Sequence, residues 1–216
     1  MGRDYGQYCG LARALDVVGD RWNLLIVREL LIGPARYGEL REGLPGIATN
    51  LLTDRLRDLE TAGVVERRLS DDSSAIAYAL TPWGAQLREP INGLIRWSTP
   101  LMISGPQGDT FRAEGLLVAL PALFAGRIPA KQGVAIGVTA DGVTVQLLST
   151  DTGVEVGRPD GRQLQAVLTA EGPLILGLSA GVLALDDIRA LVRIEGEISA
   201  LRIFFDAPGS SVDVGV

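Results

Sequence analysis

Apolar positions in the first half of the chain recur at helical intervals. Residues 22–32 form the first such run, which Gly33-Pro34 ends, and residues 37–42 form a shorter one. After a turn at residues 43–46, a third run occupies residues 49–63, where Gly63 closes it. The pattern predicts one helix followed by a helix-turn-helix pair.

The third predicted helix has one apolar and one polar face, because its leucines recur at about 100° per residue. The apolar face consists of Ala48, Leu52, Leu56 and Leu59. The polar face, which we expect to contact DNA, consists of Thr49, Asn50, Thr53, Asp54 and Arg57. A helix that packs by its leucines and presents Thr, Asn and Arg outward fits the major groove, although a merely solvated face has a similar composition.

One residue of this helix and two residues of the preceding helix have different expected roles. Arg55 lies at the edge of the leucine face, so we expect it to form an ion pair within the protein. Arg36 and Tyr37, at the start of the preceding helix, complete the predicted DNA contacts there, with Arg36 on a phosphate.

A strand hairpin is predicted directly after the third helix, at residues 64–69 and 76–81. Its tip, residues 70–74, carries two acids and no base, which argues against deep insertion into a minor groove. Arg67 and Arg68 precede the tip, and strand alternation predicts that one of them points outward. The hydroxyls of Ser73 and Ser74 are candidates for hydrogen bonds to phosphates.

Two further helical stripes are more apolar than a compact domain of this size needs. Thr81 and Pro82 begin a helix that runs to about residue 97, and Pro90 is expected to bend it. Its stripe consists of Leu87, Ile91, Leu94, Ile95 and Trp97. The other stripe, near the N-terminus, consists of Leu11, Ala14, Leu15 and Val18. Such a surplus of apolar surface predicts a homodimer interface.

An ordered series of short motifs carries a family resemblance. The motifs are Cys9, Gly19-Asp20-Arg21-Trp22, Ile26, Arg36-Tyr37-Gly38-Glu39-Leu40, Pro45-Gly46-Ile47, Leu52-Thr53-Asp54-Arg55-Leu56, Leu59-Glu60-Thr61-Ala62-Gly63-Val64-Val65, Tyr78-Ala79-Leu80-Thr81 and Trp83-Gly84. Together they resemble the HxlR family of bacterial transcription regulators, which is close to the MarR regulators. The resemblance implies a winged helix-turn-helix fold and a homodimeric repressor or activator that binds double-stranded DNA, with a palindromic operator.

Cys9 has two interpretations. Its position matches the redox-sensing cysteine of several HxlR members, and Arg13, one helical turn away, would lower its pKa. The alternative, slightly favoured, is a small apolar side chain buried in the dimer interface.

Charge and missing residue types limit the possible functions. Residues 1–100 hold 12 Arg and no Lys against 13 acids, residues 101–216 hold 8 bases against 13 acids, and the total is −6. A DNA-binding half this close to neutral needs its arginines on one surface. With no His and a single Cys, the chain has no His-based nucleophile system, and neither a disulfide nor a Cys-rich zinc site can form. We therefore expect no enzyme, metal or cofactor.

The lengths of the apolar runs indicate whether the protein is expected to insert into a membrane. The longest, residues 116–125 and 174–185, are too short and too interrupted by Gly and Pro to span a bilayer, and no signal peptide is visible. The expectation is a cytoplasmic protein without membrane contact.

The second half of the chain reads mostly as strand, after a Gly/Pro-rich linker at residues 99–109. The predicted strands are residues 134–138, 143–147, 154–157, 164–169 and 190–194, with a tight turn at Asp141-Gly142. The predicted helices are residues 113–124, 173–179 and 198–205. Asp151-Thr152-Gly153 matches the aspartic-protease tripeptide, but a turn is the better account. The fold class is therefore α+β, with domains at residues 1–98 and 111–207.

Short hydrophobic motifs in this half carry a looser resemblance. They are Ala166-Val167-Leu168-Thr169-Ala170, Leu176-Gly177-Leu178 and Val192-Arg193-Ile194-Glu195-Gly196-Glu197 with Ala200-Leu201, and they resemble the sterol-carrier-protein-like domain. The resemblance implies a curved sheet and helices around an apolar tunnel, although the longer helix at the end of the lipid-transfer members is missing, which argues against transport.

We expect a small apolar ligand in this second domain. Small residues, including Gly137 and Gly157, suggest space where a tight core would hold larger side chains. The predicted pocket residues are Val138, Leu147, Gly177 and Gly181. Two alternatives stay open: a filled core that only adds dimer contacts, and a lipid carrier whose N-terminal module serves dimerisation.

Overall fold

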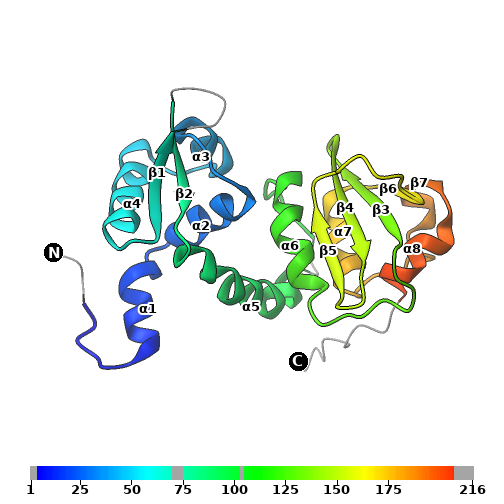
Figure 1. Cartoon of the computed structure of the whole chain (residues 1–216), viewed down its shortest axis with the longest axis horizontal. Coiled ribbons are helices and arrows are strands. Elements are labelled where there is room, and N and C mark those ends of the chain that lie inside the picture. The colour runs from blue at the N-terminus through cyan, green and yellow to red at the C-terminus, as the bar shows by residue number, and fades with distance from the viewer. Residues whose placement is uncertain (1–3, 70–74, 103–104, 207–216) are drawn as a thin grey trace. The chain divides into compact units, whose positions relative to one another are not determined.

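The computed structural model describes residues 4–69, 75–102 and 105–206 (Figure 1). The chain divides into two compact units, Met1–Ile91 and Asn92–Val216. The division falls within helix α5 (Arg88–Ser98), ahead of the segment in which the sequence places the linker.

The first unit has the architecture of a winged helix-turn-helix domain. Its elements are α1 (Gly10–Val18), α2 (Asn23–Ile32), α3 (Tyr37–Gly43), α4 (Thr49–Thr61), β1 (Val65–Leu69) and β2 (Ile76–Leu80). The predicted helix, the helix-turn-helix pair and the hairpin are confirmed, with bounds that shift by one or two residues. Gly63 adopts a φ of 76°, which lets the chain reverse after α4 and enter β1.

The core of this unit lies between α2, α3 and α4. Ile26 of α2, Leu40 of α3 and the α4 residues Leu52 and Leu59 are completely buried, and Leu56 is nearly so. Each such side chain contributes about 1.5–3 kcal/mol on leaving water. Ala48 was expected on the same face, but it is exposed because α4 begins after it and its own backbone is extended.

The hairpin β1–β2, here called the wing, is antiparallel, with Arg67 opposite Tyr78. Tyr78 also exchanges two backbone hydrogen bonds with Ala35, of 2.8 and 2.9 Å, so the loop between α2 and α3 closes the free edge of β2. The predicted phosphate contacts Ser73 and Ser74 lie outside the described residues.

The segment after the wing differs from the single bent helix that the sequence suggests. The Thr81 hydroxyl donates to the Gly63 carbonyl at 2.7 Å and accepts the Gly84 N–H at 3.0 Å, which confirms its capping role. A short 3-10 helix (Gly84–Leu87) follows, and α5 begins at Arg88. Pro90 therefore lies in the first turn of α5, where its missing N–H is harmless, and not in a helix interior.

The second unit is an α+β layer with a five-stranded sheet. Its main elements are α6 (Leu116–Leu123), β3 (Ala135–Ala140), β4 (Val143–Ser149), β5 (Val154–Gly157), β6 (Ala166–Thr169), α7 (Gly172–Ser179), β7 (Arg193–Gly196) and α8 (Ile198–Phe205). Short 3-10 helices occupy Thr99–Met102, Ala113–Gly115 and Arg189–Leu191. The last of these explains why the fifth strand begins at Arg193, three residues later than its predicted start.

The strand order is β5-β4-β3-β6-β7, with β3 and β6 parallel and the other neighbours antiparallel. Helices α7 and α8 pack on β3, and α6 packs beside β5 (Figure 1). The turn at Asp141-Gly142 has φ values of 47° and 78°, as the predicted hairpin requires. The core is mostly apolar, with Ile136, Leu120 and Leu147 completely buried in it, and Ser149 and Ser179 are buried beside them.

Within the described ranges, no helix combines the length and the apolar character that crossing a bilayer requires.

Gly84 offers a test of how tightly the first unit is packed. A Cβ at this position would overlap the backbone carbonyl of Val64, which cannot move without shifting β1. We expect Gly84→Ala to lower the free energy of unfolding by about 1–3 kcal/mol, measured by urea unfolding with circular dichroism.

Gly38→Ala is the matched control, since a Cβ there meets nothing within 4 Å and the position is helical. It should leave stability unchanged or raise it by up to about 1 kcal/mol. Equal unfolding midpoints for the two variants would contradict the close approach at Gly84.

Candidate nucleic-acid interface

The polar face of α4 is open to solvent. Its five predicted contact residues are all exposed, namely Thr49, Asn50, Thr53, Asp54 and Arg57. The Arg57 side chain is 68% exposed and forms only a long ion pair with Asp54, 3.6 Å across one helical turn. Because pairs of this kind contribute little, the Arg57 guanidinium can turn toward another acceptor at small cost.

Tyr37 fixes the first turn of α4 against α3. Its hydroxyl donates to the Thr49 carbonyl at 2.7 Å, and the Thr53 hydroxyl donates to the same carbonyl at 3.0 Å. Tyr37 is half-buried by this contact. Tyr37, which is predicted to contact DNA, thus also serves to position α4.

Arg36 is the residue immediately before α3, and its side chain is exposed. Its backbone N–H donates to the Glu39 carboxylate, so the chain enters α3 in a fixed direction. Its exposed place at the start of α3 is compatible with the phosphate contact that the sequence predicts.

The expectation that Arg55 forms an ion pair within the protein is confirmed. Arg55 forms an ion pair with Asp20 and a second, of 3.2 Å, with Asp58. Its side chain is 21% exposed. The pair with Asp20 ties α4 to the turn between α1 and α2, which opposes rotation of α4 about its axis.

The two wing arginines are both half-exposed and both paired. Arg67 lies 2.9 Å from the Glu60 carboxylate and stacks over the Tyr78 ring, 5.8 Å from its centroid. Arg68 lies 2.6 Å from Glu66, its neighbour on the same face of β1. Their side chains leave the strand on opposite faces, as strand alternation predicts, and both are half-exposed.

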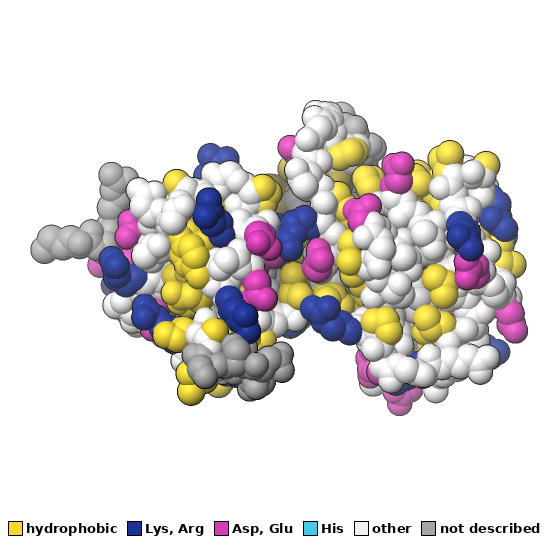
Figure 2. All heavy atoms as spheres, turned by 90° about the horizontal axis from the view of Figure 1, so that it is seen from above, with side chains coloured by type: hydrophobic (Ala, Val, Ile, Leu, Met, Phe, Trp, Pro, Cys, Tyr) yellow, Lys and Arg dark blue, Asp and Glu magenta, His cyan; other side chains and the backbone are white. Residues whose placement is uncertain are grey.

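The face of the first unit seen in Figure 2 carries scattered charges and no continuous basic patch. Lys or Arg side chains alternate there with Asp and Glu side chains. We expected the arginines of the first half to cluster on one surface, because the net charge of that half is close to zero. Figure 2 shows no such cluster on this face.

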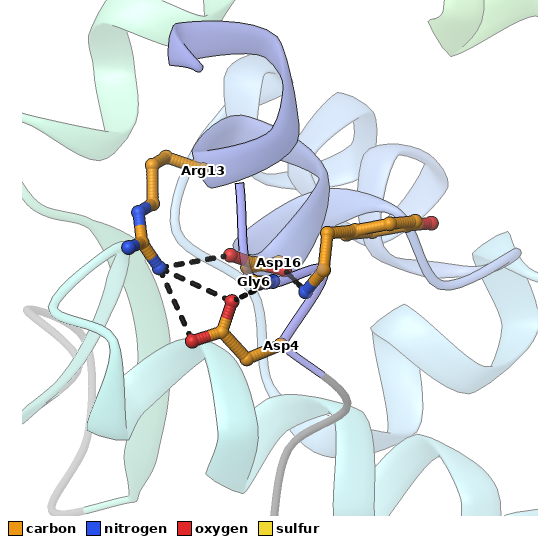
Figure 3. Close-up of polar contacts among 5 residues, drawn as sticks. Asp4, Gly6, Arg13 and Asp16 are labelled. Carbon is orange, nitrogen blue, oxygen red and sulfur yellow. Dashed lines mark hydrogen bonds and ion pairs between the residues drawn. The ribbon is translucent and has the colours of Figure 1, made fainter. Parts of the chain in front are cut away.

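Cys9 is the residue before α1, and its thiol is exposed. Hydrogen bonds from the backbone N–H groups of Ala12 and Leu11 lower the pKa of this thiol. Arg13, the expected cause, instead binds Asp4 at 3.2 Å and Asp16 at 3.5 Å (Figure 3). Burial of Cys9, the alternative interpretation, does not occur within the single chain.

The apolar stripes expected at a dimer interface are largely uncovered. On α1, Leu11 is 68% exposed and Leu15 39%, while Val18 is buried. On α5, Leu94 and Trp97 are exposed and Ile91 is buried. Each helix thus buries part of its stripe and leaves the rest exposed to solvent.

The four predicted pocket residues of the second unit differ in their surroundings. Val138 and Leu147 are completely buried in the core. A Cβ on Gly177 would meet Leu183 at 2.6 Å, and one on Gly137 would meet Leu164 at 3.0 Å. The idea that these glycines leave empty space is therefore wrong at Gly137 and Gly177, where leucine side chains fill it.

Gly181 has a different neighbour. A Cβ there would lie 3.8 Å from an Nη atom of Arg127, a residue to which the sequence pattern assigned no role. The signal in the sequence was faint, because Arg127 is a single charge shortly after a long apolar run.

Comparison with known proteins identifies the first unit. The model of the HxlR-like helix-turn-helix family matches residues 17–104. YvaP of Bacillus subtilis, named an HTH-type transcriptional regulator, is 35% identical over 40% of this chain and 82% of its own length. The chain belongs to the HxlR-like helix-turn-helix family. Its first unit is that of an HxlR-type transcriptional regulator.

Two other relatives carry names of the same kind. The regulator sll1512 of Synechocystis is 36% identical over 38% of this chain and 62% of its own length, so the match spans less than two thirds of that protein. YodB of Bacillus subtilis is 34% identical over 39% of this chain and 77% of its own length. The reduced form of YodB aligns with a TM-score of 0.40, at 31% identity over 46% of this chain and 99% of that one. The family match ends at residue 104, and the resemblance of the second unit to sterol carriers stays a prediction.

Proposed function

We propose that this protein is a homodimeric transcriptional regulator that binds a palindromic operator in double-stranded DNA through α4. The observation that carries the proposal is the exposed polar face of α4, in a unit of the HxlR family, held in place by the Tyr37 and Arg55 contacts. Two-fold symmetry would place two copies of α4 in successive major grooves, about 34 Å apart.

In this proposal the residues of α4 and its neighbours have distinct tasks. Asn50 and Arg57 read base edges, because both are exposed and carry groups that pair with bases in two hydrogen bonds. Arg36 binds a phosphate. Arg67 and Arg68 bind phosphates only after exchanging Glu60 and Glu66 for them, so the wing contributes less than a basic hairpin would.

The second unit is proposed to bind an apolar ligand and to adjust DNA binding. Its fusion to a unit of a DNA-binding family and its mostly apolar core support a sensor. Such regulation requires that the ligand favour one arrangement of the chain over another, typically by about 1–3 kcal/mol. A pure lipid carrier would instead show no DNA binding, and a gel-shift assay separates the two functions.

Cys9 is proposed to make DNA binding sensitive to oxidation. The support is its exposure together with the lowered pKa of its thiol, because the thiolate is the form that reacts with oxidants.

The first prediction concerns base reading. Arg57→Ala and Asn50→Ala should each weaken binding to an operator selected in vitro from random DNA by about 1–3 kcal/mol, and weaken random DNA less. Arg36→Ala should weaken both equally and flatten the salt dependence. Fluorescence anisotropy at several salt concentrations measures this.

Arg193→Ala is the control, since Arg193 is an exposed arginine of the second unit. It should leave operator affinity unchanged. Equal losses on operator and random DNA for Arg57→Ala and Asn50→Ala would show that α4 contacts only phosphates.

The second prediction concerns assembly. The protein should be a dimer at micromolar concentration in multi-angle light scattering, and Leu11→Glu should shift it toward monomer by placing a charge in the interface. Ile128→Glu is the matched control, because Ile128 is as exposed as Leu11, at 68%, but lies in the second unit. A monomeric wild-type protein would reject the proposal.

The third prediction concerns Cys9, the single cysteine of the chain. Its alkylation rate by iodoacetamide should rise with pH to a midpoint below the ordinary cysteine value of about 8.5, because the Ala12 and Leu11 amides favour the thiolate. The same chain in urea, which has lost these hydrogen bonds, should show a higher midpoint.

The regulatory half of this prediction uses diamide. The oxidant should change operator binding of the wild type, dithiothreitol should reverse the change, and Cys9→Ser should not respond. If Cys9→Ser responds to diamide as the wild type does, oxidation acts elsewhere.

A further inference from the structure

Strand β7 ends the five-stranded sheet and leaves one edge of it open. In the strand order β5-β4-β3-β6-β7, β7 pairs on one side with β6 (Figure 1). The strand at the opposite end, β5, packs against α6. No strand among the described residues pairs with the outer edge of β7. Such an edge presents backbone N–H and C=O groups to which another strand can bind.

The hydrogen bonds to β6 determine which residue of β7 directs its backbone groups outward. The Glu197 N–H donates to the Gln165 carbonyl at 2.9 Å, just beyond the end of the paired strands. Bonded and non-bonded pairs alternate along antiparallel strands, so Glu195 and Arg193 also bond to β6, whereas Ile194 does not. The N–H and C=O of Ile194 therefore point to the outer edge, and no described residue forms a hydrogen bond with them.

The pairing of β6 with β3 leads to the same assignment. The Ala170 N–H donates to the Thr139 carbonyl of β3 at 3.1 Å, so Ala170 faces β3. Because backbone groups alternate in direction along a strand, Leu168 also faces β3 and Val167 faces β7. Val167 is the partner of Glu195 in β7. Glu195 is therefore bonded to β6, and the residue before it directs its backbone groups outward.

The exposed side chains of β7 carry opposite charges. Those of Arg193 and Glu195 are 77% and 59% exposed, and they form an ion pair of 2.6 Å on one face of the strand. Ile194 lies between them in sequence and packs partly against the core on the other face. If two copies of β7 pair antiparallel about a two-fold axis at Ile194, Arg193 of each copy lies opposite Glu195 of the other. The edge is therefore complementary in charge to a second copy of itself.

The same register also brings apolar side chains together. Leu191, just before β7, is 65% exposed, and Ile198, at the start of α8, is 36% exposed. Antiparallel pairing about Ile194 directs the Leu191 end of one strand toward the Ile198 end of the other. Gly196, with a φ of 83°, ends the strand and limits the paired segment to a few residues. A contact of this kind is specific but buries little surface.

We propose that the second units of two chains pair along β7, in register about Ile194, and join their sheets into one. The contact consists of a hydrogen-bonded pair of the two Ile194 residues and an ion pair from each Arg193 to Glu195 of the other copy. Because it is short, it forms between chains that the proposed homodimer already holds together, where their effective concentration is high. The inference therefore rests on the proposed homodimer. Loss of the β7 contact leaves the apolar stripes of α1 and α5 intact, so Arg193→Ala remains a valid control for operator binding.

Protection of the edge is the competing account. Charged side chains on an edge strand discourage pairing with other chains, because pairing would remove them from water or bring like charges together. Arg193 and Glu195 would then serve to keep the second units apart. The two accounts differ in whether position 193 of one chain lies next to position 195 of another.

The experiment tests this by disulfide cross-linking in the full chain, with Cys9→Ser as the background because Cys9 is the single cysteine. Chains with Arg193→Cys and chains with Glu195→Cys, one kind carrying a longer affinity tag, are produced together and oxidised with diamide. In the proposed register, the Cα atoms of positions 193 and 195 of opposite chains are about 4.5 Å apart, whereas those of two copies of position 193 are about 7–8 Å apart. Disulfides need a Cα separation below about 7 Å.

A non-reducing gel should show mostly the mixed disulfide. Random collision of equal amounts of the two chains would give about twice as much mixed product as either uniform product, and the register predicts at least about tenfold. The mixed dimer also keeps one ion pair of Arg193 and Glu195, which the uniform dimers lack.

Proline at the centre of the register is the second variant. Ile194→Pro in both chains should remove the preference for the mixed product, because proline has no N–H to donate to the other copy. The Ile194 N–H takes no part in pairing with β6, so the circular dichroism spectrum should stay unchanged. Ile194→Val is the matched control and should keep the preference.

Light scattering on the same samples before oxidation separates this inference from the proposed homodimer. A dimer that yields the mixed and uniform products in random proportion would overturn the β7 contact and leave the homodimer standing. A monomer that yields no cross-linked product would overturn both. A preference for uniform products would overturn the register about Ile194. A preference for the mixed product that survives Ile194→Pro in a folded chain would overturn strand pairing as its cause.

Discussion

Burial of the leucine face of α4 is the constraint on which the proposed DNA-binding surface depends. Leu52 and Leu59 are completely removed from water and Leu56 nearly so, and a rotation of α4 about its axis would expose them at a cost of several kcal/mol. The Arg55–Asp20 pair and the Tyr37 hydrogen bond act in the same sense from either side of the helix. The outward direction of Asn50 and Arg57 is therefore a consequence of core packing and needs no contribution from DNA.

The charge distribution is unusual for a surface that is proposed to bind DNA, which is a polyanion. The chain carries a net charge of −6, and several arginines of the first unit are held by its own acids. Exposed pairs of this type are worth about 1 kcal/mol or less, so exchanging a carboxylate for a phosphate is feasible. In the proposed complex, the released carboxylate would stay near the DNA and repel it. The fit of α4 to the groove would then have to supply more of the affinity than in a strongly basic protein.

The sequence predicted those parts of the fold that hydrophobic periodicity alone determines. The α4 face, the wing strands and the strands of the second sheet follow from spacing and from turn residues such as Asp141-Gly142. Contacts between elements distant in sequence were not predictable in this way. The filling of Gly177 by Leu183 and the approach of Arg127 to Gly181 depend on how α6, α7 and their loops pack, which one-dimensional patterns do not encode.

The parallel pairing at the centre of the second sheet has a consequence for synthesis on the ribosome. In the first unit, Arg67 pairs with Tyr78, only a short loop away, so that unit can complete its sheet early. In the second unit, β3 can pair with β6 only after Val167, the partner of Gly137, has been synthesised. Strand β6 in turn can pair with β7 only after β7 has been synthesised. Strand pairs so far apart in sequence form late, and the waiting edge of β3 carries apolar residues such as Ile136 and Val138. A nascent chain therefore presents an unpaired hydrophobic edge during elongation, and the second unit rather than the first is where chaperone protection would be needed.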